Sequence, residues 1–103
     1  MNYSIEFSEI ATNDLNEIFE YIATNLKSPQ SAIKILSSIE SAISSLQIMP
    51  ERYHVYDTKK WKERNLRVMP VDNYLVFYIP THNNLKVTII RILYSKRNVK
   101  AIV

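Results

Sequence analysis

The first half of the chain changes from a strand-like to a helix-like spacing of apolar residues. Tyr3, Ile5 and Phe7 alternate with polar residues, which predicts a short half-buried strand. Ser8 can then cap a helix, because apolar residues recur three or four positions apart from Ala11 to Ile22. We expect this helix to stop near Asn25. Its polar side carries three acids, which we expect to be exposed: Asp14, Glu17 and Glu20.

A second helix is predicted directly after the first. Ser28 is a good cap, and Pro29 suits the first helical position, where a missing N–H costs nothing. Apolar residues recur at helical spacing up to Leu46, and Pro50 cannot continue the helix, so we expect an end near Gln47. Two helices with a short connection form an antiparallel hairpin.

The second half of the chain has the period of strands. Residues 50–64 are charged and aromatic and predict a loop. Residues 66–69, 74–79 and 85–94 predict three strands, the first two ended by Pro70 and Pro80, with turns at 72–73 and 82–84. Short connections make these strands an antiparallel meander. The prediction is one α+β domain over residues 1–103: strand, helix, helix and a three-strand meander, with the helix hairpin on one face of a mostly antiparallel sheet.

The composition excludes several kinds of site. Without cysteine there is no disulfide, thiolate chemistry or Cys-type zinc site, and without glycine there is no Walker A loop or Rossmann fingerprint. His54 and His82 lie 28 residues apart and form no ligand pair, so we expect neither a metal nor a cofactor. No apolar run approaches the roughly 18 to 20 residues that span a bilayer, and no signal peptide is evident. We therefore expect a cytoplasmic protein that does not contact membranes.

Charge is distributed unevenly along the chain. Residues 1–50 have a net charge of −4, and residues 51–103 have a net charge of +7. Two basic clusters dominate the second half: Lys59, Lys60, Lys62, Arg64 and Arg67, and then Lys86, Arg91, Lys96, Arg97 and Lys100. The asymmetry indicates an anionic partner, although a plain solvated surface gives the same pattern.

Three residues in this half have two readings each. Trp61 among lysines is either a stacking platform for bases or a hydrophobic plug over the helix hairpin. Arg91 lies in register with apolar residues, which favours a structural ion pair. Arg67 alternates with Leu66 and Val68, so we expect it to face away from the core.

Five segments of the sequence, taken in their order along the chain, resemble the RelE/ParE superfamily of toxins from bacterial toxin–antitoxin modules. They are residues 3–8 (YSIEFS), 18–23 (IFEYIA), 49–53 (MPERY), 67–78 (RVMPVDNYLVFY) and 90–98 (IRILYSKRN). The resemblance covers nearly the whole chain. It implies a growth-inhibiting toxin that is kept silent by a cognate antitoxin, which wraps the toxin through a segment that folds on binding.

The resemblance also implies candidate site residues. RelE-like members cut messenger RNA on the ribosome without a metal, whereas ParE-like members poison DNA gyrase. The nuclease branch carries an arginine where this chain has Leu75, while Arg97 matches a basic residue at the end of the last strand. The catalytic candidates are therefore Arg97, Lys96 and Tyr94, although an aromatic at the edge of the core is the favoured interpretation of Tyr94 over a general acid. The target-binding candidates are Arg67, Lys59, Lys60, Lys62, Arg64 and Trp61.

Leu75 and the hairpin at residues 70–74 favour the ParE-like branch and gyrase. The alternatives are a RelE-like endoribonuclease, and a basic binding module or inactive toxin.

Overall fold

The computed structural model describes residues 2–103 and has two long helices, two four-residue helices, four strands and short helical turns. The order of the principal elements is β1 (Ser4–Phe7), α1 (Glu9–Glu20), α2 (Pro29–Ser44), α3 (Lys59–Lys62), β2 (Arg67–Val71), β3 (Tyr74–Thr81), β4 (Lys86–Tyr94) and α4 (Val99–Ile102). The predicted α+β fold is confirmed. No helix within residues 2–103 is long and apolar enough to cross a membrane.

The four strands form one mixed sheet in the order β1-β4-β3-β2. β2, β3 and β4 form the expected antiparallel meander, and β1 pairs with β4 in parallel, with Ile5 opposite Val87. The helix hairpin connects β1 to the meander by a long crossover. This long connection allows β4, the last strand of the meander, to lie beside β1 and to run parallel to it.

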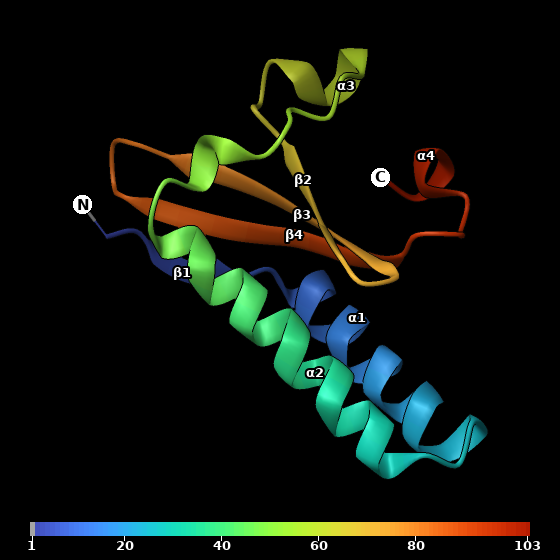
Figure 1. Ribbon diagram of the computed structural model, residues 1–103. Coiled ribbons are helices and arrows are strands. Elements are labelled where there is room, and N and C mark those ends of the chain that lie inside the picture. The colour runs from blue at the N-terminus through green and yellow to red at the C-terminus, as the bar shows by residue number, and fades with distance from the viewer. Residues whose placement is uncertain (1) are drawn as a thin grey trace.

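The sheet separates two hydrophobic clusters. α1 and α2 cover one face, where Ala11, Ile39 and Ile43 pack on Val76, Tyr78 and other strand residues. On the opposite face, Leu66, Phe77, Leu93 and Val103 form a smaller cluster under α3 and α4 (Figure 1). Four-residue helices give too little periodicity to be recognised in a sequence. The expectation that residues 50–64 form only a loop was therefore wrong at α3 and at the 3₁₀ turn Pro50–Arg52, and α4 was missed.

Both prolines that we expected to end strands lie inside them. Pro70 is tolerated because β2 is the last strand of the sheet and has one free side. Pro80 lies in β3, but the pairing of β2 with β3 ends at Arg67 opposite Tyr78, so Pro80 has only β4 as a neighbour. The strand-ending rule failed because the sheet order decides whether a proline removes a needed hydrogen bond.

The first helix ends at Asn25, as expected, although Asn25 itself is not left-handed. Its last part is a π-helical turn, Tyr21–Asn25, and the left-handed residue is Lys27, with a φ of 50°. The predicted turn after β2 is confirmed, and Asp72 takes the left-handed conformation there, with a φ of 54°. The second helix ends close to the predicted place, since a 3₁₀ turn carries α2 on to Gln47.

Candidate functional site

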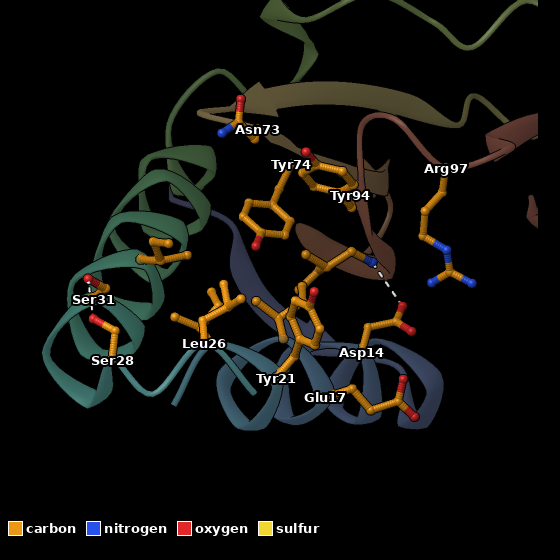
Figure 2. A pocket seen from close by; sticks show the side chains of 14 residues that line it. Asp14, Glu17, Tyr21, Leu26, Ser28, Ser31, Asn73, Tyr74, Tyr94 and Arg97 are labelled. Carbon is orange, nitrogen blue, oxygen red and sulfur yellow. Dashed lines mark hydrogen bonds between the residues drawn. The ribbon is translucent and has the colours of Figure 1, made fainter. Parts of the chain in front are cut away.

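A cleft of about 750 Å³ opens between the tip of the helix hairpin and the end of the sheet. Glu17, Tyr21 and Leu26 line it from the helical side, and Tyr74, Tyr94 and Arg97 line it from the side of the sheet (Figure 2). Tyr21, Leu26 and Tyr94 are exposed over 54%, 57% and 38% of their surface. These three exposed side chains lie on both walls of the cleft, and a cluster of exposed large side chains of this kind marks an interaction site.

The π-helical turn builds the helical wall of this cleft. An extra residue in the turn changes the direction in which the following side chains leave the helix, and such turns are frequent at functional sites. Tyr21 begins the turn and Ile22 is buried within it. Both line the cleft, with Tyr21 directed toward the tyrosines of the sheet (Figure 2).

Tyr74 is a neutral hydrogen-bonding group in the cleft. Tyr74 and Tyr94 are opposite each other on β3 and β4, and their rings meet edge to face with centroids 5.8 Å apart. Burial raises the pKa of Tyr74, and the neighbouring phenols of Tyr94 and Tyr21 add to the rise in that pKa. Tyr74 therefore stays protonated at neutral pH and offers a phenol hydroxyl rather than a phenolate base.

A buried ion pair lies at one end of the cleft, where Asp14 is part of the lining. The carboxylate of Asp14 on α1 accepts hydrogen bonds from Arg91 Nε (2.8 Å), Arg91 NH2 (2.9 Å) and the backbone N–H of Ile92 (3.0 Å). The hydrogen bonds to Asp14 raise the pKa of Arg91, which stays charged. The predicted ion pair of Arg91 is confirmed, but the expectation that Asp14 is exposed was wrong. Asp14 faces the sheet because its carboxylate satisfies a cation on β4.

The three catalytic candidates, Tyr94, Lys96 and Arg97, do not form one site with residue 75. Tyr94 and Arg97 line the cleft, which lies on the face of the sheet that α1 and α2 cover, whereas Lys96 is exposed in the turn after β4. Leu75 pairs with Leu93, and both belong to the cluster on the opposite face of the sheet. Tyr94 and residue 75 therefore point to opposite faces, so an arginine at position 75 would not join Tyr94 in one site.

The basic target-binding candidates gather around α3 on the second face of the sheet. Trp61 donates from Nε1 to the backbone oxygen of Val103 (2.8 Å), and the charges of Lys60 and Arg64 lie 5.1 and 5.5 Å from its ring centroid. Beside it is a cavity of about 410 Å³, which Lys60 and Lys100 also line. Trp61 is partly buried against the C-terminal segment. Trp61 is thus a hydrophobic plug, as one of the two interpretations had it. It does not cover the helix hairpin, however, because it packs against the C-terminal segment on the opposite face of the sheet.

Arg67 has a different setting from the other basic candidates. Its NH1 donates to the backbone oxygens of Glu51 (2.8 Å) and Tyr53 (2.7 Å), its NH2 lies 3.7 Å from the Glu51 carboxylate, and its side chain is only 14% exposed. The expectation that Arg67 faces away from the core was wrong, because the loop carbonyls hold its guanidinium against the molecule. This geometry favours a structural role for Arg67 over contact with a target.

Sequence reasoning overlooked Tyr21, Tyr74 and Leu26 as residues of one cleft. The helical and strand patterns mark each of them only as apolar, and the π-helical turn has no sequence signal that we could use. Within residues 2–103, no group of three or more His, Cys, Asp or Glu side chains is placed to hold a metal ion.

Comparison with known proteins identifies the family. Residues 5–99 match the family model for the ParE toxin of the type II toxin–antitoxin system parDE. The fold is similar to a chain of the chromosomal ParDE system from P. aeruginosa, with 17% identity, a TM-score of 0.74, and coverage of 91% of this chain and 97% of that chain.

Two RelE-type structures are also similar. A chain of the RelBE2 complex from Mycobacterium tuberculosis has 17% identity and a TM-score of 0.64 over 91% of this chain and 99% of that chain. A mutant of the E. coli toxin RelE in the free state has 13% identity and a TM-score of 0.65 over the whole of both chains. No curated protein sequence matches this chain significantly. Because the family model spans nearly the whole chain, the protein belongs to the ParE toxin family of type II toxin–antitoxin systems.

Proposed function

We propose that this toxin inhibits growth by binding DNA gyrase, as ParE-like toxins do, and that it does not cut messenger RNA. The observation that carries the proposal is the position of Leu75. The residue stands where the nuclease branch has an arginine, and here it packs in an apolar cluster with Leu93 and Phe77. Metal-free RNA cleavage needs a base, an acid and cations around one phosphate. A leucine at this place removes one of those cations, and Tyr94 on the other face cannot replace it.

The basic surface around α3 is the proposed contact for the target. Lys59, Lys60, Lys62 and Arg64 lie on or next to α3, and Lys100 lies beside the same cavity. The contacts of Trp61 with Val103 keep this region against the sheet. A surface of this charge suits an acidic protein face or the DNA that gyrase holds.

We also propose that a cognate antitoxin neutralises the toxin by placing a segment in the cleft. Two similar structures are toxin–antitoxin complexes, the RelBE2 complex from Mycobacterium tuberculosis and the RelE–RelB complex from Pyrococcus horikoshii. The exposed side chains of Tyr21, Leu26 and Tyr94 are what an apolar face of a partner would cover. We expect this antitoxin segment to fold when it binds, and the cleft has room for a few of its large side chains.

A ribosome-dependent endoribonuclease is the second candidate. The specific feature in its favour is Trp61, an aromatic ring flanked by Lys60 and Arg64, since aromatic and cationic side chains together hold single-stranded RNA. A basic binding module or an inactive toxin shares the same surface and is the third.

Purified components separate these candidates. The chain is added to DNA gyrase in a supercoiling assay, and in parallel to translating ribosomes with an end-labelled messenger. The proposal expects loss of supercoiling and an intact messenger, and expects the α3 variant Lys59→Ala/Lys62→Ala to inhibit gyrase less. A messenger cut by the parent chain, with gyrase unaffected, would decide for the ribonuclease.

A further inference from the structure

Arg97 is the cation of the cleft that has no acidic partner. Within residues 2–103, Arg97 makes no ion pair, whereas the other cation at this end, Arg91, is bound by Asp14. The backbone N–H of Arg97 donates to the oxygen of Tyr94 (3.1 Å), so the chain turns back directly after β4. This turn brings the guanidinium to the mouth of the cleft, above Asp14 and Glu17 (Figure 2).

Of the other charges at this end of the cleft, Asp14 and Arg91 pair with each other, whereas Glu17 makes no ion pair within the described residues. Asp14 is satisfied by three hydrogen bonds, and Glu17 lies close enough to Arg91 to add to the rise in the pKa of that arginine. The opposite end carries the hydroxyls of Ser28 and Ser31, which hydrogen-bond to each other (2.7 Å). The cleft therefore has an aromatic middle, a neutral end, and an end at which Arg97 and Glu17 both lack an ion-pair partner in the part of the chain that the structure describes.

We infer that Arg97 is a partner-recognition residue, and that it binds an acidic side chain of the antitoxin segment that occupies the cleft. The inference rests on the proposed neutralisation at this cleft. It removes Arg97 from the toxic surface, where its position at the end of the last strand had suggested catalysis. Lys96, its neighbour, does not line the cleft and has no part in this recognition.

The expected partner segment has a definite pattern. Large apolar side chains enter between Tyr21 and the Tyr74–Tyr94 pair, and an Asp or Glu near one end meets Arg97. Glu17 stands near the same end and opposes that acid. Glu17 therefore distinguishes an acidic partner from a basic one. Neutralising Glu17 strengthens the binding of an acidic segment and weakens the binding of a basic segment.

The test uses the full-length toxin and the full-length antitoxin of its own module, expressed from two separately controlled promoters. Arg97→Ala should be as toxic as the parent in the absence of antitoxin. It should need about fivefold more antitoxin for the same rescue, the factor that corresponds to one lost charge contact at a rim. With the purified proteins, Arg97→Ala should raise the Kd about fivefold and reduce the salt dependence of binding. Glu17→Gln should lower the Kd.

Lys96→Ala is the matched control, because it removes the adjacent exposed cation and should leave the antitoxin Kd unchanged. Circular dichroism and Trp61 emission verify folding.

Four results would overturn the inference. A folded Arg97→Ala protein that is no longer toxic would place Arg97 on the target surface. An unchanged Kd for Arg97→Ala, or a raised Kd for Glu17→Gln, would show that the partner brings no acid here. A dimer of the free chain that Arg97→Ala dissociates would show that a second copy fills the cleft. Absence of toxicity in the parent would instead count against the proposed function, while the binding measurement would still test Arg97.

Discussion

Breaking the Asp14–Arg91 pair should be the most costly single polar change in this protein. The pair joins α1 to β4, and the two side chains are only 9% and 21% exposed. Asp14→Ala leaves the guanidinium of Arg91 without its anion in a largely buried place and also removes the acceptor of the Ile92 N–H. Breaking a buried pair costs about 3 to 5 kcal/mol. Because Arg91 keeps some contact with water, we expect a loss near the lower value, about 3 kcal/mol of the free energy of unfolding.

The double variant Asp14→Leu/Arg91→Met tests the reason for that cost. It removes both charges and keeps apolar volume, and such replacements are often close to neutral. We expect it to regain about 2 kcal/mol relative to Asp14→Ala. The assay is urea unfolding followed by circular dichroism at 222 nm and by Trp61 emission.

Glu6→Ala provides the matched control. It breaks the Glu6–Lys86 pair, which also joins an N-terminal element to β4 at 3.2 Å but is exposed to water. Exposed pairs contribute under about 1 kcal/mol. An Asp14→Ala cost no larger than the Glu6→Ala cost would refute the account of the buried pair.

Three further predictions concern pH, toxicity and the second face of the sheet. Burial raises the pKa of Tyr78 from 10.0 to about 12, so the stabilisation from its neutral form is complete below pH 10 and is lost as the pH rises from 10 to 12. The parent should lose about 2 kcal/mol more than Tyr78→Phe over that interval, as measured by urea unfolding, and parallel curves would contradict this. Glu17→Lys and Glu20→Lys should leave growth inhibition intact without antitoxin, because an acidic face of α1 repels an anionic target; a folded but harmless variant would show that this face contacts the target. Trp61→Phe should lower the free energy of unfolding by about 1 kcal/mol and increase proteolysis after residue 94, since it removes the indole bond to Val103, and unchanged cleavage would show that this bond does not hold the C-terminal segment.

Much of the fold followed from apolar periodicity, but contacts between distant residues did not. The helix hairpin and the meander were predictable because each is set by spacing within a short segment. Asp14 was misplaced because its partner Arg91 lies 77 residues away, and nothing in the pattern of α1 distinguishes it from Glu17. Pro70 and Pro80 were misread for a related reason, since only the order of the strands shows which sides carry hydrogen bonds.

The candidate site was predictable as residues but not as an arrangement. Tyr94, Lys96 and Arg97 were selected from the end of the last strand, and the structure divides them between the cleft and an exposed turn. The cleft itself depends on the π-helical turn at Tyr21, which makes Tyr21 face Tyr74 across the gap. Leu75 could be noticed from the sequence, but only the pairing with Leu93 shows that its face is opposite that of Tyr94.

Pulse labelling after induction of the toxin tests the proposed target most directly. Cells receive labelled thymidine or labelled methionine within minutes of induction, and the SOS response is followed in parallel. A gyrase inhibitor stops thymidine incorporation and induces SOS while methionine incorporation continues at first, and this is the result that we predict. An immediate loss of methionine incorporation, with thymidine incorporation maintained and no SOS response, would contradict the proposal.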